Sequence, residues 1–75
     1  MGWIGLIGLG VMGENLAVNI ASKGYGIVVY NRTASKTREF LERAGGVKEI
    51  AGAYTLNELT SSLERPRKII LMVKA

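Results

Sequence analysis

A glycine-spaced turn between an apolar run and an amphipathic segment constrains this chain more than any other feature. The apolar run Trp3–Ile7 is followed by Gly8, Gly10 and Gly13 in a G-x-G-x-x-G pattern. After Gly10 the apolar residues recur with a helical period until Gly24, which supplies a helix stop signal. One helical stripe then holds Gly13, Leu16, Ala17, Ile20 and Ala21. The first third of the chain therefore predicts a strand, a tight turn and a helix.

The rest of the chain continues to alternate between strand and helix. Ile27–Tyr30 is a run of β-forming residues. A second helix is predicted over Ala34–Ala44, ended by Gly45-Gly46. Segment 47–53 is ambiguous and compatible with a short edge strand, and a last apolar strand is predicted over Ile69–Val73. The inward-facing residues of the second helix are predicted to be Phe40, Leu41 and Ala44.

A third helix is indicated by Thr55 and Glu58, which have the spacing of a capping box. Pro66 is expected to stop this helix. Its apolar stripe is predicted to consist of Leu56, Leu59 and Leu63.

This order of elements predicts an α/β fold with a Rossmann-like parallel sheet and helices on both faces. Continuous apolar strands separated by helices are typical of parallel sheets covered on both sides. Right-handed crossovers place the first two helices on one face and the third on the other. Part of the second face should then be bare. We therefore expect residues 1–75 to form the N-terminal part of a larger dinucleotide-binding domain.

Composition excludes several classes of site. The chain has no Cys or His, and its six acidic residues are all Glu, so thiol chemistry, Cys/His zinc sites and His-based triads are ruled out. The net charge of +4 comes from dispersed basic residues, which favours solvated surface charge over a nucleic-acid interface. The run Trp3–Met12 is too short for a transmembrane helix and lacks the flanks of a signal peptide. The absence of Cys fits a cytoplasmic protein.

The glycine-rich turn has the spacing that binds a dinucleotide pyrophosphate. Gly8 permits the tight turn, Gly10 lets the backbone approach the phosphates, and Gly13 allows the helix to pack close to the strand. The phosphates would then meet the free N–H groups at the start of the first helix. A glycine-rich turn without a ligand is the alternative.

The end of the second predicted strand favours NADP over NAD. NAD-binding folds place a carboxylate there, whereas this chain has Asn31, Arg32 and Thr33 and no acidic residue between Glu14 and Glu39. Asn31 and Thr33 can donate hydrogen bonds, and Arg32 offers a planar fork suited to a phosphate. The alternative is that Arg32 is a solvated turn residue and Thr33 only a helix cap. Lys74, at the end of the last strand, could face either the cofactor or solvent.

Three separated motifs resemble the start of the 6-phosphogluconate dehydrogenase family: Ile4–Ala17, Val29–Thr33 and Arg65–Ala75. The resemblance covers nearly the whole chain. It implies an NADP-dependent oxidative decarboxylase of the pentose phosphate pathway, which converts 6-phosphogluconate to ribulose 5-phosphate and is a homodimer. It also implies cofactor contacts by three segments, which contain Gly8, Leu9, Gly10, Val11, Met12 and Gly13; Asn31, Arg32 and Thr33; and Val73, Lys74 and Ala75.

The resemblance implies no catalytic residue in this chain, because the family's large helical domain supplies those residues. We therefore expect the chain alone to be inactive. Two other interpretations stay open at this point: a related β-hydroxyacid dehydrogenase, and a stand-alone nucleotide-binding module without catalysis.

Overall fold

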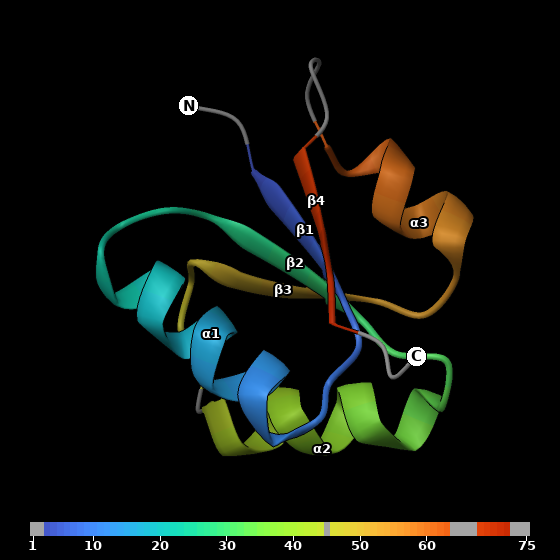
Figure 1. The fold of residues 1–75 in the computed structure, drawn as a ribbon, viewed down its shortest axis with the longest axis horizontal. Coiled ribbons are helices and arrows are strands. Elements are labelled where there is room, and N and C mark those ends of the chain that lie inside the picture. Colours follow the sequence, from blue (N-terminus) through green and yellow to red (C-terminus); the bar gives the residue numbers. More distant parts are fainter. Residues whose placement is uncertain (1–2, 45, 64–67, 73–75) are drawn as a thin grey trace.

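In a computed structural model of the chain, the described residues are 3–44, 46–63 and 68–72. Within these ranges the chain forms four strands and three helices in strict alternation (Figure 1). Their bounds are β1 Ile4–Ile7, α1 Val11–Ser22, β2 Ile27–Tyr30, α2 Ala34–Ala44, β3 Ile50–Ala53, α3 Leu56–Ser61 and β4 Lys68–Leu71.

The four strands form one parallel sheet in the order β3-β2-β1-β4, which confirms the predicted fold class. Leu6 of β1 lies opposite Val29 of β2 and Ile70 of β4. The ambiguous segment 47–53 does contain a strand, β3, which is an edge strand of the described sheet. The last strand begins at Lys68, one residue earlier than predicted, and its predicted end at Val73 lies outside the described residues.

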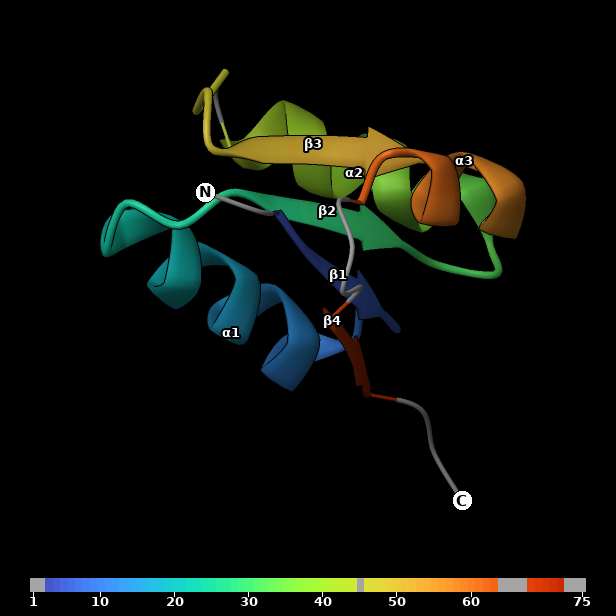
Figure 2. The same ribbon diagram turned by 90° about the horizontal axis from the view of Figure 1, so that it is seen from above.

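The helices divide between the two faces of the sheet as predicted (Figures 1 and 2). Because side chains alternate along a strand, each strand supplies residues to both faces. One buried cluster lies between the sheet and helices α1 and α2; it contains Leu6, Leu9, Ala17, Ala21, Ile27, Val29 and Phe40. The other lies beneath α3 and contains Val28, Ala53, Leu59 and Leu63. None of the helices in the described ranges has the length and apolar character needed to cross a membrane.

The predicted bare area lies on the α3 side of β4. Ile69 is paired with Gly5, where a Cβ would touch the Leu63 and Leu59 side chains, so Ile69 faces the same side as α3. Leu71 faces that side as well, and the two residues are 41% and 65% exposed. Helix α3 therefore covers the centre of this face but leaves the side chains of β4 open in the described structure.

Helix α3 is shorter than predicted. The Thr55 hydroxyl accepts a hydrogen bond from the Glu58 amide at 3.0 Å, which confirms the predicted N-cap. The Glu58 carboxylate closes the turn on the amide of Tyr54, at 2.6 Å. The helix ends at Ser61, before the predicted stop at Pro66, which lies outside the described residues.

The predicted apolar stripe of α3 is only partly correct. Leu59 and Leu63 are buried, whereas Leu56 is 54% exposed. Leu56 opens the helix just after the chain leaves the edge of the sheet at Ala53, so less of the sheet lies beneath its side chain.

Removing the cap of α3 should destabilise the fold. Thr55→Ala is expected to lower the free energy of unfolding by about 1 kcal/mol, because the Glu58 amide loses its acceptor. Urea unfolding followed by circular dichroism measures this loss. Ser61→Ala, at the exposed end of the same helix, is the matched control and should change stability by less than about 0.5 kcal/mol. Equal stability of Thr55→Ala and wild type would contradict a stabilising cap.

Candidate functional site

The glycine-rich turn joins β1 to α1 at the carboxyl edge of the sheet and is clamped by the neighbouring strands. The Gly8 amide donates to the Tyr30 carbonyl at 2.9 Å, and the Met72 amide donates to the Ile7 carbonyl at 2.7 Å. Gly8 has φ +106°, and a Cβ there would overlap the Met72 carbonyl. Only glycine fits this position, as the tight-turn prediction required.

Gly13 and Gly10 have different steric surroundings. A Cβ on Gly13 would overlap the Gly8 carbonyl oxygen and would contact the Leu6 side chain of β1, which confirms that glycine at position 13 lets α1 pack close to the strand and the turn that follows it. A Cβ on Gly10 would meet no atom within 4 Å among the described residues. The chain's own packing therefore explains glycine at positions 8 and 13, whereas Gly10 faces open space at the N-cap of α1.

The start of α1 presents backbone amides that the helix itself does not use. The Glu14 amide donates to the Gly10 carbonyl at 2.9 Å and is the first amide bonded within the helical turn. The amides of residues 10–13 precede it, and the described part of the chain offers them no acceptor. The side chains of Val11 and Met12 are exposed, so water reaches this end of the helix. Free amides and the helix dipole together favour an anion here.

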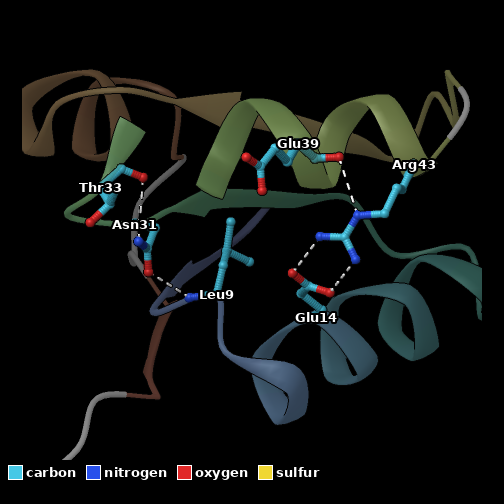
Figure 3. Close-up of polar contacts among 6 residues, drawn as sticks. All are labelled: Leu9, Glu14, Asn31, Thr33, Glu39 and Arg43. Carbon is cyan, nitrogen blue, oxygen red and sulfur yellow. Dashed lines mark hydrogen bonds and ion pairs between the residues drawn. The ribbon is translucent and has the colours of Figure 1, made fainter. Parts of the chain in front are cut away.

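Asn31 connects the end of β2 to the glycine-rich turn (Figure 3). Its Oδ1 accepts a hydrogen bond from the Leu9 amide at 2.8 Å, and its Nδ2 donates to the Thr33 carbonyl at 3.3 Å. The Asn31 backbone amide donates to Thr37 Oγ1 at 3.2 Å. The predicted contact between Asn31 and the cofactor stays a prediction; within the chain its carboxamide bonds to Leu9 and Thr33.

Thr37 is the residue of this network that the sequence analysis missed. It is fully buried on α2, with 0% exposure, although threonine in a helix that follows a polar turn usually suggests a solvated position. A Cβ at Gly52 of β3 would touch both Leu41 and Thr37, so Thr37 packs against the sheet. The absence of a side chain at Gly52 leaves room for the helix.

Arg32 and Thr33 follow β2 and are exposed beside the turn. The Arg32 side chain forms no hydrogen bond or ion pair with any described residue. The structure thus brings residues 8–13 and 31–33 together at one edge of the sheet, through the contact between Leu9 and Asn31. The predicted contacts Val73, Lys74 and Ala75 lie outside the described residues.

A second polar contact lies next to this site. Both Glu14 oxygens accept from the Arg43 guanidinium, at 3.0 and 2.7 Å, so the pair is bidentate and joins α1 to α2 (Figure 3). Arg43 Nε also faces the Glu39 carbonyl at 3.4 Å. The hydrogen bonds to Glu14, and then its charge, raise the pKa of Arg43. The positive guanidinium of Arg43 offsets the negative charge of the Glu14 carboxylate, which lies in the first turn of α1.

A groove of about 570 Å³ lies between the C-terminal parts of α1 and α2, near Ala21, Ala44 and Val47. None of the residues that line this groove belongs to segment 8–13 or segment 31–33, so the groove is separate from the candidate site.

Comparisons with known proteins point to one family. A family model described as the NAD binding domain of 6-phosphogluconate dehydrogenase matches residues 3–75. The NADP(+)-dependent, decarboxylating 6-phosphogluconate dehydrogenase of Bacillus subtilis is 60% identical over 72 residues, which are 96% of this chain and 15% of that protein. A chloroplastic, decarboxylating 6-phosphogluconate dehydrogenase of Spinacia oleracea is 57% identical over 74 residues, covering 96% of this chain and 14% of that protein.

A solved structure shows the same fold. The 6-phosphogluconate dehydrogenase of Plasmodium falciparum, described in its apo form and in complexes with NADP+ and with 6-phosphogluconate, superimposes with a TM-score of 0.85 at 51% identity. The match covers 97% of this chain and 16% of that one. The chain thus spans about 15% of the length of the curated relatives reported above.

Proposed function

The chain belongs to the family of NAD-binding domains of 6-phosphogluconate dehydrogenase, and from this membership we propose that it is the NADP-binding part of such an enzyme. The proposed parent reaction is the oxidative decarboxylation of 6-phosphogluconate to ribulose 5-phosphate, with NADPH as the second product. The observation that carries the proposal is the juxtaposition, at one edge of the sheet, of the first α1 amides with the exposed side chain of Arg32, neither of which has a partner among the described residues.

The residues present fit a phosphorylated dinucleotide. The amides of residues 10–13 would hold the pyrophosphate, and the open space at Gly10 would admit it without a steric conflict. Arg32 would pair with the 2′-phosphate, and Thr33 would add a hydrogen bond from its hydroxyl. When bound, NADP supplies the hydride acceptor. Leu9 would contribute packing, since it is only 2% exposed and its amide is bonded to Asn31.

Further features of the parent enzyme are part of this proposal. Val73, Lys74 and Ala75 would complete the cofactor site at the end of the last strand. We assign no catalytic residue to the 75 residues and propose that the chain alone does not oxidise 6-phosphogluconate. The parent would be a cytoplasmic homodimer whose other residues bind the substrate.

Nucleotide binding by the 75-residue chain tests the proposed function. Titration calorimetry is expected to show one NADP bound per chain, with at least tenfold weaker binding of NAD at low salt, because only NADP offers a phosphate to Arg32. If neither nucleotide bound, or if NADP bound no more tightly than NAD, the proposed function would be wrong.

A further inference from the structure

We propose that Asn31 acts as a positioning residue, which affects nucleotide binding by holding the glycine-rich turn through the Leu9 amide. This inference rests on the proposed function for its binding consequence. Its structural part, the control of Leu9 by Asn31, stands independently of any ligand.

The contact between Asn31 and Leu9 is the one side-chain hydrogen bond to residues 8–13 in the described structure. The other contacts that clamp the turn, from Gly8 to Tyr30 and from Met72 to Ile7, join backbone to backbone. Leu9 is 2% exposed, so its amide could not readily find water if Asn31 were removed. An unpaired amide at this depth costs more than an ordinary hydrogen bond, and the turn would shift to satisfy it.

Asn31 is itself held from two sides. Its backbone amide donates to buried Thr37 at 3.2 Å, which sets the position of the residue at the end of β2. Its Nδ2 donates to the Thr33 carbonyl at 3.3 Å, and this donor identifies the opposite atom as the oxygen that faces Leu9. A carboxamide suits this position because it needs an acceptor at one end and a donor at the other.

This arrangement separates the roles of two neighbouring residues. Arg32 has no partner in the described chain and is free to meet a phosphate. Asn31, in contrast, acts on the turn that would hold the pyrophosphate, which NADP and NAD share. Removing the Asn31 side chain should therefore lower the affinity for both nucleotides by the same factor, whereas removing the Arg32 side chain should lower the affinity for NADP alone.

The first test measures the turn without any nucleotide. Hydrogen exchange of the Leu9 amide, followed by NMR in the 75-residue chain, is expected to be at least tenfold faster in Asn31→Ala than in wild type. The Gly8 amide, which donates to the Tyr30 carbonyl, is the internal control for general unfolding. In Asn31→Asp a carboxylate oxygen can still accept from Leu9, but the donor to the Thr33 carbonyl is lost, so protection of the Leu9 amide should lie between that of wild type and that of Asn31→Ala. Unchanged Leu9 exchange in Asn31→Ala would overturn the proposal.

The second test measures binding by calorimetry with NADP, NAD and 2′-AMP. Asn31→Ala should weaken NADP and NAD equally, by roughly three- to tenfold, which is the worth of about one hydrogen bond. Binding of 2′-AMP, which has no pyrophosphate, should change less than about twofold. A selective loss of NADP, or an equal loss of 2′-AMP, would instead show that Asn31 contacts the nucleotide directly. If wild type bound neither dinucleotide, the proposed function would fail, while Leu9 exchange would still decide the structural claim.

Discussion

Replacing Arg32 with alanine is expected to weaken NADP binding by roughly 10- to 150-fold and to leave NAD binding nearly unchanged. A charge-assisted hydrogen bond to the 2′-phosphate is worth on the order of 1.5–3 kcal/mol, which corresponds to that range of affinity. Arg32 is exposed and forms no interaction with the described chain, so its removal should not disturb the fold. Calorimetry of wild type and Arg32→Ala with both nucleotides measures the effect.

Salt and a second arginine serve as controls for this prediction. The preference of wild type for NADP should shrink as salt is added, because the charges meet at the surface and are screened. Arg38→Ala removes an exposed arginine from α2, with the same change in net charge, and should alter NADP affinity by less than about twofold. Equal losses of affinity for NADP and NAD in Arg32→Ala would show that Arg32 supports the glycine-rich turn instead of the 2′-phosphate. If neither affinity fell, Arg32 would be a solvated residue without a role in binding.

Replacing Gly13 with alanine is expected to lower the free energy of unfolding more than removing the Thr55 cap does. A methyl group at this position of α1 would overlap the Gly8 carbonyl oxygen. The Cβ of alanine is fixed to the helix backbone and the Gly8 carbonyl belongs to the backbone of the turn, so neither can rotate away. Such overpacking costs about 1–3 kcal/mol, and we expect a value near the upper end. Helix α1 would also shift away from the turn and carry its free amides with it. NADP affinity should therefore fall in the fraction of molecules that remain folded.

Gly10→Ala is the matched control, since it adds the same methyl group only three residues away. No described atom lies within 4 Å of that methyl, so the loss of stability should stay below about 1 kcal/mol, the usual cost of alanine at an N-cap. Urea unfolding of both variants distinguishes them. Similar stability of the two variants would show that the contact between Gly13 and Gly8 does not limit the packing of α1.

The sequence predicted the elements of the fold well where the pattern is local. The change from an apolar run to a helical period at Gly10 located β1 and α1, and Ile27–Tyr30 and Ala34–Ala44 were predicted with the bounds found in the structure. The Thr55 cap was also found from its spacing. The prediction failed at Leu56, because helical spacing specifies a stripe but not how far the sheet extends beneath it.

The position of the candidate site could be predicted from the sequence, but the hydrogen bonds within the site could not. The glycine spacing and the residues after β2 identified the two turns, since the carboxyl ends of parallel strands lie at one edge. The sequence could not show that the Asn31 carboxamide bonds within the chain, and neither Thr37 nor the pair of Glu14 and Arg43 was singled out.

By itself, the sequence determined the period of each segment and the glycine turn, because these depend on residues close together along the chain. The parallel sheet followed from the alternation of strands and helices, since right-handed crossovers leave few arrangements. Only the tertiary structure decided which distant groups meet: Asn31 lies 22 residues from Leu9, and Arg43 lies 29 from Glu14. The register that places Ile7 beside Tyr30 and Leu71 brings Gly8 against Met72. The physical reason is that a hydrogen bond requires its two atoms within about 3 Å, and strand register and helix packing, rather than residue spacing, control distances on that scale.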